Sequence, residues 1–415
     1  MATAPASAVW QAVEQEAGAG RHNWSGSLMF RPAQIFAPRD EGELAGIVVR
    51  AREAGRTVRP IGSGHSSTPI IATDDILVSL EHFAGVQSEV SPDHEVDVGA
   101  GGKLDALSEA LLAQGVAFPN YGDIATQAIA GVISTGTHGS GRTLHNLSMM
   151  LCGGRFVTGT GAILDFDEKS DPGFVRAIRV AMGTAGIFTR VRLRLLPAYE
   201  LRRIEWCTDM RTTMGDLERL GAENRNFDFY WYPRSDVVKL RCLNPPERAT
   251  DYSSFARRVE DRTGPPHEVI PKHSGLPFRF EEMEYAVPLE AGPACFAAVR
   301  RRILERWRRT VGWRVLYRLV KGDDSWLSEA HGRDTVTISL HQNASLPYAA
   351  FFADIEPIFR AHGGRPHWAK QHSLLAADLE PLYPRWRDFL AFRDGLDPDG
   401  VFMTPYLRRL FGVPA

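Results

Sequence analysis

The stretch Thr57-Val-Arg-Pro-Ile-Gly-Ser-Gly-His-Ser66 places a short apolar run directly before a glycine-rich loop that ends on a histidine. Gly62 and Gly64 carry no Cβ, so backbone N–H groups can converge there on an anion such as a pyrophosphate. The two serines add hydroxyl donors, and His65 brings an imidazole within reach of the bound group. The loop lacks the third glycine of a dinucleotide fingerprint and the Gly-Lys-Ser/Thr of a P-loop. These residues alone fit a strand and an anion-binding loop, or an ordinary glycine turn with a surface histidine.

A second segment is also rich in glycine and hydroxyl-bearing residues. It comprises Phe118-Pro-Asn-Tyr-Gly-Asp123 followed by Gln127-Ala-Ile-Ala-Gly-Val-Ile-Ser-Thr-Gly-Thr-His-Gly-Ser-Gly141, in which small residues and hydroxyls alternate with apolar ones. This composition suits a backbone that lies against a flat ligand. The hydroxyl donors are Ser134, Thr135 and Thr137, and the glycines that permit close approach are Gly131, Gly136 and Gly139.

Together the two segments resemble the vanillyl-alcohol-oxidase superfamily of flavoproteins. The motif Pro366-His-Trp-Ala-Lys370 narrows the resemblance to the sugar-oxidising branch, which includes aldonolactone oxidases and alditol oxidases. Further matching segments are Asn23-Trp-Ser-Gly26, Met283-Glu-Tyr-Ala-Val-Pro288, Gly322-Asp-Asp324 and Gly332-Arg-Asp-Thr335. The resemblance therefore covers essentially the whole chain.

The resemblance implies an α+β fold with a split FAD-binding domain of the vanillyl-alcohol-oxidase type and an α+β substrate-binding cap domain. We expect the FAD-binding domain in residues 1–199 and the cap domain in residues 200–382. Residues 383–415 are expected to form a C-terminal segment that returns to the FAD-binding domain.

The implied cofactor is FAD, joined covalently to His65, because relatives with Gly-Ser-Gly-His-Ser attach the 8α-methyl carbon of the flavin to this imidazole. His138 is expected to support its loop by hydrogen bonding. The expected cofactor-binding residues are Pro60, Ile61, Gly62, Ser63, Gly64, His65, Ser66, Asp123, Gly131, Ser134, Thr135, Gly136, Thr137, His138, Gly186 and Ile187.

The implied reaction is the oxidation of a sugar-derived alcohol, such as an aldonolactone or an alditol, by hydride transfer to flavin N5. O2 is the expected electron acceptor, which gives H2O2. This chemistry needs a base for the hydroxyl proton and positive groups that stabilise the alkoxide and the reduced flavin. Lys370 and Arg318 match family positions with those cationic roles, and His341 and Asp123 match positions that face the substrate.

One position departs from the resembled pattern. Relatives place a glutamate two residues before the arginine, whereas this chain has Leu316 there. His341 or Asp123 could take the hydroxyl proton instead, and Glu284 is expected to belong to the scaffold. The substrate is therefore expected to differ from that of the well-known lactone oxidases. The alternatives are an oxygen-avoiding dehydrogenase, an oxidase of a secondary-metabolite sugar, and a flavin-binding protein without catalysis.

Composition excludes several other classes. Of the 415 residues 44% are hydrophobic and 24% charged, and the net charge is −2, so neither nucleic acid nor an anionic membrane is an expected partner. No apolar run approaches the roughly 18 residues of a membrane span, and we expect a cytoplasmic protein. The four cysteines, Cys152, Cys207, Cys242 and Cys295, lack metal-ligand spacing, so we expect them to be reduced and buried, with no metal site.

Local patterns predict several elements. A helix should begin after Asp40, with Glu43 in its first turn, and end at Gly55. Strands are predicted at residues 75–80, 95–98 and 189–195, and helices at residues 104–114 and after residue 175. The arginine-rich residues 299–310 are interpreted as a solvated helix face.

Overall fold

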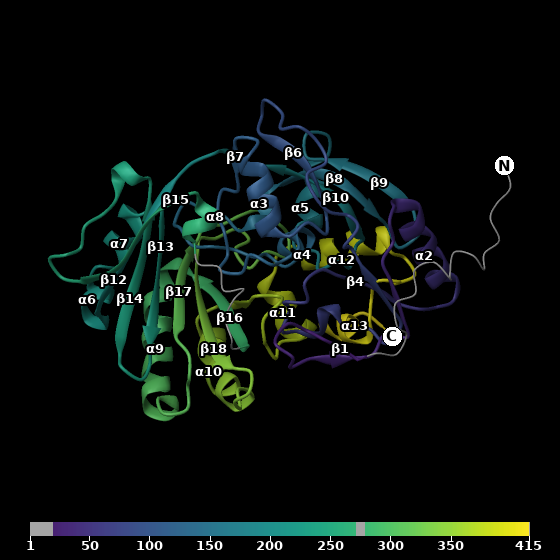
Figure 1. Cartoon of the computed structure of the whole chain (residues 1–415). Helices are drawn as coiled ribbons and strands as arrows, with labels where there is room; N and C mark the ends of the chain where they lie inside the picture. The colour runs from purple at the N-terminus through teal and green to yellow at the C-terminus, as the bar shows by residue number, and fades with distance from the viewer. Residues whose placement is uncertain (1–19, 271–278, 415) are drawn as a thin grey trace.

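The computed structural model describes residues 20–270 and 279–414. Figure 1 shows two lobes side by side. One lobe is built on an eight-stranded sheet, and the other contains a four-stranded sheet, a three-stranded sheet and helices. This mixture of helices with separate sheets confirms the expected α+β class. Within the described ranges, no helix combines the length and the apolar composition that crossing a membrane requires.

The glycine-rich loop follows the end of a strand in a small parallel sheet. The strands of this sheet are, in spatial order, β3 (Gln34–Phe36), β5 (Ile76–Ser79) and β4 (Val58–Ile61). Helix α2 (Glu41–Glu53) connects β3 to β4. Its N-cap is Asp40, whose side chain accepts a 2.9 Å hydrogen bond from the backbone N–H of Glu43, as predicted. The loop therefore starts from the edge strand β4, which pairs with the central strand β5.

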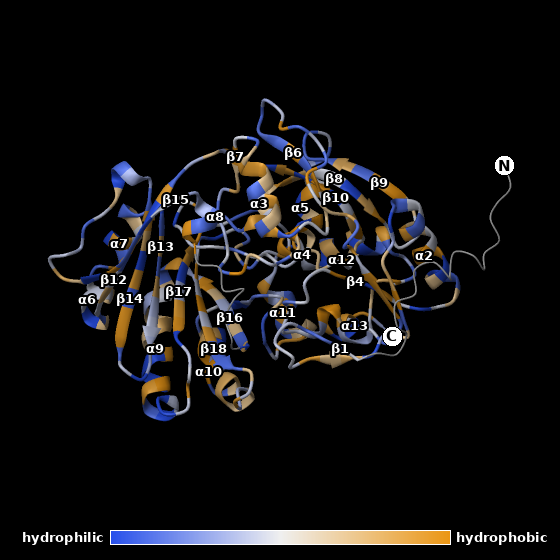
Figure 2. Cartoon of the chain, viewed as in Figure 1, coloured by the Kyte–Doolittle hydropathy of each residue, from blue (hydrophilic) through white to orange (hydrophobic). Residues whose placement is uncertain are grey.

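The four-stranded sheet is antiparallel and confirms the predicted alternation at residues 189–195. Its strands, in spatial order, are β6 (Glu95–Gly99), β10 (Ile187–Arg194), β8 (Leu151–Val157) and β9 (Ile163–Asp167). Along β10, Val191 and Leu193 are buried, whereas Arg190 and Arg192 are half-buried and Arg194 is exposed. Hydrophobic and hydrophilic residues are both present in the strands of the two lobes (Figure 2).

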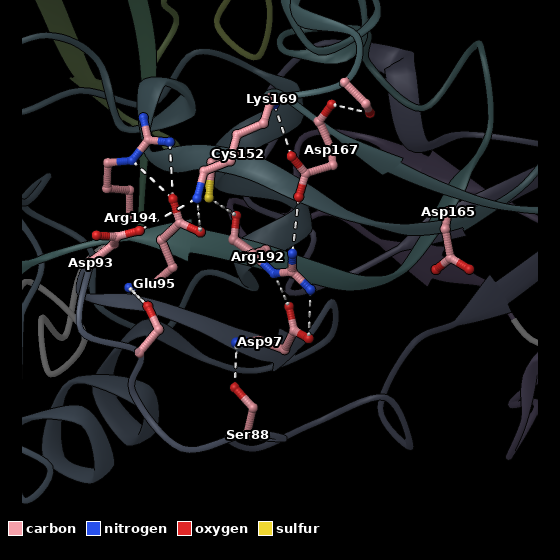
Figure 3. A network of polar contacts seen from close by, with 12 residues as sticks. Ser88, Asp93, Glu95, Asp97, Cys152, Asp165, Asp167, Lys169, Arg192 and Arg194 are labelled. Carbon is pink, nitrogen blue, oxygen red and sulfur yellow. Dashed lines mark hydrogen bonds and ion pairs between the residues drawn. The ribbon is translucent and has the colours of Figure 1, made fainter.

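The exposed face of this sheet carries a network of ion pairs (Figure 3). Arg192 lies between Asp97 and Asp167, with N–O distances of 3.0 Å to each. Arg194 contacts Glu95 at 3.0 Å. Exposed pairs of this kind contribute about 0–1 kcal/mol each. The arginine-rich strand is therefore a solvated face of the scaffold.

The eight-stranded antiparallel sheet forms the core of the other lobe. Its strands, in spatial order, are β15 (Arg257–Gly264), β12 (Leu201–Asp209), β14 (Val237–Asn244), β13 (Asn226–Tyr232), β17 (Val315–Val320), β18 (Thr335–Asn343), β16 (Phe280–Pro288) and β19 (Arg365–Pro366). Helices α9 (Gly292–Arg302) and α10 (Ala349–Ala361) pack against it.

The packing of one aromatic residue shows which side chains face away from these helices. Tyr317 of β17 stacks on Phe229 with a centroid distance of 4.8 Å and meets Phe296 of α9 edge-on at 5.7 Å. Successive side chains of a strand point to opposite faces. Leu316 and Arg318 therefore project from the other face of the sheet.

The C-terminal segment packs on the lobe that contains the parallel sheet. Helices α12 (Trp386–Leu396) and α13 (Pro405–Phe411) lie in that lobe with α2 and β4 (Figure 1). The backbone N–H of Val58 donates to the Val401 carbonyl at 2.8 Å, and Arg59 donates to the Phe402 carbonyl at 3.0 Å. These contacts hold the C-terminal segment against strand β4. The boundaries at residues 199 and 382 stay predictions, and residues 1–19 lie outside the described ranges.

Two predicted helices are shorter than expected or displaced. The helix predicted at residues 104–114 ends at Leu112, and the helix expected after residue 175 begins at Pro172 and ends at Ile178.

The remaining elements are β1 (Arg21–His22), β2 (Met29–Phe30), η1 (Pro69–Ile71), α3 (Leu104–Leu112), β7 (Val116–Ala117), α4 (Ile129–Ser134), η2 (Leu147–Met150), α5 (Pro172–Ile178), β11 (Leu196–Pro197), α6 (Met210–Gly215), α7 (Leu217–Glu223), η3 (Pro246–Arg248), α8 (Pro266–Val269), η5 (Leu289–Ala291), η6 (Ile303–Trp307), α11 (Ala376–Leu379) and η7 (Glu380–Leu382).

The remaining local predictions concern the basic stretch and the cysteines. The chain continues from α9 into the π-helical turn η6, and the arginines of this stretch are partly exposed, with Arg302 and Arg306 both contacting Asp354. All four cysteines are free thiols, as expected. Three of them are buried and Cys207 is half-buried.

Candidate active site

A cavity with about 1630 Å³ of empty volume, open solvent at its mouth included, lies where the two lobes meet. Its wall combines the loop after β4, helix α4 and the start of β10 with the face of the eight-stranded sheet that carries Leu316 and Arg318. All the sequence-predicted site residues line it except Gly136. A concave site with a few convergent polar groups is the expected form of a small-molecule site.

Gly136 is the one predicted cofactor-binding residue that does not line the cavity. Its φ of +72° is the left-handed conformation that favours glycine, and a Cβ there would lie 2.7 Å from Glu329 Oε2. The residue is therefore needed for the turn between α4 and His138. It does not belong to the cavity wall.

The glycine-rich loop is packed too closely for larger residues. A Cβ at Gly62 would lie 2.7 Å from the Cβ of Ala128, and Gly64 has a φ of +66°. On α4, a Cβ at Gly131 would meet no atom of the described chain within 4 Å. Because Gly131 lines the cavity, its missing side chain leaves room for a ligand at that point.

His65 has one ring nitrogen engaged and one available. Its Nε2 lies 3.0 Å from the Thr126 hydroxyl, whereas Nδ1 has no hydrogen-bond partner in the described part of the chain. Burial, and then the charges of Lys370 and Lys103, lower the pKa of His65 to about 4. The imidazole is therefore neutral at neutral pH, which covalent attachment through a ring nitrogen requires.

A buried carboxylate on β16 holds Arg318. Glu284 contacts Arg318 and the Ser339 hydroxyl through Oε2, and His138 Nε2 lies 2.8 Å from its Oε1. Burial raises the pKa of Glu284, but Arg318 and His138 outweigh this effect and hold it well below its usual range. The Nε of Arg318 has no partner among the described residues, so this donor is available to a ligand.

Asp123 is engaged by the opposite lobe. Its carboxylate accepts hydrogen bonds from the Tyr230 hydroxyl at 2.8 Å and from Arg241 Nη1 at 2.9 Å. Arg241 also pairs with Asp228 at 2.7 Å. A carboxylate bound to a guanidinium is a weak proton acceptor. These contacts therefore favour a bridging role for Asp123 over a role as the base.

A second buried carboxylate, which the sequence reasoning missed, lies between two predicted catalytic residues. Glu282 Oε2 contacts the Lys370 ammonium, and Glu282 Oε1 lies 3.3 Å from His341 Nε2. Burial raises the pKa of Glu282, but the charges of Lys370 and His341 outweigh it and lower the pKa. Glu282 stands two residues before Glu284 in the strand β16, and this spacing indicates that both side chains point into the same cavity.

The sheet face also carries the apolar part of the wall. Leu316 is 3% exposed and lies in the strand ladder between Tyr230 and Ser339. Beyond it, the ring of Phe280 lies 4.9 Å from Trp313 and 5.1 Å from Trp24. All three rings line the cavity, and none of them was predicted as a site residue.

A cluster of two histidines and one glutamate at the edge of the cavity resembles a metal site in composition. Donor atoms of His138, Glu329 and His367 lie within 4.8 Å of one another. However, both ring nitrogens of His138 already contact oxygens, those of Gly139 at 2.9 Å and Glu284 at 2.8 Å. One imidazole and one carboxyl group remain, which is fewer than the three protein ligands of a typical catalytic zinc site.

Comparisons with known proteins identify the chain. Residues 32–167 match the model of a FAD binding domain, and residues 252–410 match the D-arabinono-1,4-lactone oxidase model. The protein is therefore a FAD-dependent oxidoreductase. It is 32% identical to L-gulono-1,4-lactone dehydrogenase of Mycobacterium tuberculosis, with 94% of this chain and 98% of that protein covered. The chain belongs to the family of FAD-dependent aldonolactone oxidases and dehydrogenases.

One further relative and one solved structure extend the comparison. L-gulonolactone oxidase of Scyliorhinus torazame is 26% identical, over 94% of this chain and 97% of that protein. Among solved structures, cholesterol oxidase from Brevibacterium sterolicum superimposes with a TM-score of 0.78, over 94% of this chain and 96% of that chain. Its sequence identity is 16%, so this likeness shows the fold alone.

Proposed function

We propose that the cavity binds FAD covalently through His65 and oxidises a hydroxyl group of a sugar-derived lactone. The observation that carries the proposal is the convergence of a neutral His65 and two cationic side chains, Lys370 and Arg318, on one cavity. The names of the relatives, which are lactone oxidases and dehydrogenases, support this class of substrate.

The residues of the cavity fit FAD. The loop of Gly62 and Gly64 offers a close backbone approach for an anionic group, and the open space at Gly131 offers a similar approach beside α4. The hydroxyls of Ser134 and Thr137 line the same wall. When bound, FAD supplies an acceptor for the hydride that leaves the substrate carbon.

The remaining roles belong to the sheet face. Lys370 and Arg318 place positive charge where the substrate oxygen becomes an alkoxide, and Arg318 Nε offers a free donor. His341 is the proposed acceptor of the hydroxyl proton, because the carboxylate of Asp123 is already bound to Arg241. Leu316 and the rings of the wall accept no hydrogen bond from a hydroxyl group, so they favour an apolar part of the substrate.

The proposed electron acceptor is O2. The match of residues 252–410 to a lactone oxidase supports this choice, while the Mycobacterium tuberculosis relative supports a dehydrogenase as the second candidate. Anaerobic reduction by substrate followed by mixing with air separates the two. An oxidase regains its flavin colour within the time of a turnover and forms H2O2, whereas a dehydrogenase stays reduced until another acceptor is added.

The substrate class is tested by product analysis. The holoenzyme is incubated with L-gulono-1,4-lactone, D-arabinono-1,4-lactone, a polyol series and lactones in which one hydroxyl is replaced by hydrogen or a methyl ether. Mass spectrometry should find lactone products that are lighter by two hydrogen atoms. Turnover of polyols with no turnover of any lactone would overturn the proposed substrate class.

A further inference from the structure

Three ionisable side chains meet on the sheet face beside the proposed substrate position. Lys370 and His341 both contact the carboxylate of Glu282, one at each oxygen. Glu282 is 5% exposed and His341 is 8% exposed, and all three side chains line the cavity. The cross-strand register pairs Glu282 of β16 directly with His341 of β18. The contact therefore follows from the position of both residues in the sheet.

The contacts of His341 define where its ring can accept a proton. Nδ1 lies 3.2 Å from the Arg314 carbonyl oxygen, which can only accept, so Nδ1 carries the hydrogen of the neutral ring. Nε2 then holds the lone pair and lies 3.3 Å from Glu282 Oε1. A proton taken up at Nε2 would come to lie next to a carboxylate. The resulting imidazolium would be stabilised there by the opposite charge.

We propose that Glu282 is a positioning residue, which stabilises the imidazolium that His341 becomes when it accepts the substrate hydroxyl proton and holds the Lys370 ammonium beside it. This inference rests on the proposed function. In the reaction the substrate O–H bond breaks and its proton moves to Nε2 of His341. The carbon loses a hydride, with its electron pair, to the FAD of the proposed function. Glu282 itself neither gains nor loses a proton.

The other charged groups around His341 decide whether the loss of the Glu282 carboxylate strengthens or weakens proton binding by the ring. On β16 the neighbouring charge is Glu284, after β19 it is Lys370, and on the β17 side the charges are Arg314 and Arg318. Three of these four groups are cations. Without the Glu282 carboxylate, the imidazolium would face this positive charge with less compensation. The ring would therefore hold a proton less readily in Glu282→Gln than in the wild-type enzyme.

The first test measures anaerobic flavin reduction by a lactone substrate across pH in the holoenzyme. Glu282→Gln should slow reduction by roughly 10²-fold at neutral pH. The acidic limb of its rate profile should also move to lower pH, because the base loses its proton at lower pH. Glu282→Asp should recover part of the rate. If Glu282→Gln only reduced the fraction of folded enzyme, the rate would fall but the acidic limb of the pH–rate profile would stay at the wild-type pH.

The matched control is Glu281→Gln. Glu281 is the adjacent carboxylate of β16, it is fully buried, and it accepts a hydrogen bond from Gln371 at 2.8 Å. It does not line the cavity. Glu281→Gln should keep the wild-type rate and pH profile. If Glu282→Gln has the same rate and the same pH profile as this control, Glu282 has no positioning role. The enzyme could still oxidise lactones in that case.

A second readout needs no turnover. In holoenzyme with ¹⁵N-labelled histidine rings, the signal that disappears in His341→Gln reports on this ring. Its titration midpoint should fall in Glu282→Gln and stay in place in Glu281→Gln. An unmoved midpoint would overturn the inference. The measurement stands even if no lactone reduces the wild-type flavin, an outcome that would refute the proposed function separately.

Discussion

Two cationic side chains of the cavity wall, Lys370 and Arg318, differ in their exposure to solvent. Arg318 is buried with its partner Glu284, whereas the Lys370 side chain is 23% exposed. Removing one partner of a buried pair leaves an uncompensated charge and typically costs about 3–5 kcal/mol. The two residues should therefore respond differently to the same substitution.

Lys370→Met and Arg318→Met should each slow anaerobic flavin reduction by roughly 10²–10³-fold, because each removes a preorganised positive group. Arg318→Met should also lower the free energy of unfolding by about 3–5 kcal/mol, since the buried Glu284 loses its partner. Stopped-flow reduction and urea denaturation measure the two effects. Unchanged reduction rates in both variants would refute the assigned roles.

His65 should form its flavin bond over a wide pH range. A neutral imidazole is the reacting form, and the lowered pKa of about 4 keeps the ring neutral well below the pH at which an ordinary histidine gains its proton. Covalent incorporation into apoprotein should therefore proceed nearly as fast at pH 5.5 as at pH 8. The measure is flavin that stays in the acid-precipitated pellet. A loss centred near pH 6.5 would contradict the environment of His65.

His65→Ala provides the companion test. The acid-precipitated pellet of this variant should be colourless. Before precipitation, the folded variant should still bind FAD without a covalent bond, because the other residues of the loop remain. Release of all flavin from fully loaded wild-type protein would show that no covalent bond exists.

Leu316 should set a preference among substrates. A substrate hydroxyl placed against this side chain loses a hydrogen-bond partner, and buried unpaired polar groups cost about 1–3 kcal/mol. Leu316→Glu should therefore raise kcat/KM for fully hydroxylated aldonolactones relative to partly deoxygenated ones. If the wild-type enzyme favours a plain aldonolactone over every other compound, and Leu316→Glu does not change that order, the idea fails.

Sequence reasoning located the residues whose meaning lies in short motifs. His65 and Lys370 each stand within a few residues of a recognisable pattern, and both line the cavity. Glu282 was not predicted as a site residue, because its contact partners lie far away in the sequence. The contact with Lys370 spans 88 residues, and only the sheet register brings His341 opposite. The motif nearest to Glu282 drew attention to Glu284 instead.

At the scale of elements, strand β14 is tied to the opposite lobe through one arginine. Arg241 contacts Asp228 within the sheet and Asp123 beyond it. Arg241→Met should therefore lower the free energy of unfolding by about 3–5 kcal/mol, because Asp228 is 2% exposed and would be left unpaired. Urea denaturation measures this change, with Arg202→Met of the half-exposed Arg202–Asp261 pair as control. Equal stability of the two variants would refute the bridging role.

Elements with strong local signals were predicted well. The N-cap at Asp40 and the alternation along β10 are both readable from a few neighbouring residues. Helix α5 was misplaced, because its true start at Asp171-Pro172 lies before the apolar residues that suggested it. The order of the eight-stranded sheet could not be derived, since its neighbouring strands are often distant in sequence, as with β13 and β17.

At the scale of the whole molecule, the cavity exists because two lobes meet along it. The lobe of the parallel sheet contributes the glycine-rich loop with His65, and the eight-stranded sheet contributes the charged face with Arg318, Glu282 and His341. Helix α12 of the C-terminal segment lies back in the lobe of the parallel sheet, but the cavity wall comes from residues 24–188 and 230–370. The catalytic surface is thus assembled from both halves of the sequence.

The most direct test of the account is the absorbance of the bound flavin when holoenzyme is mixed anaerobically with aldonolactones. At least one lactone should bleach the visible flavin band at a rate that supports turnover. The bleached flavin should also stay with the protein pellet after acid precipitation. A flavin that no aldonolactone bleaches, in protein shown to be fully loaded and folded, would contradict the central claim.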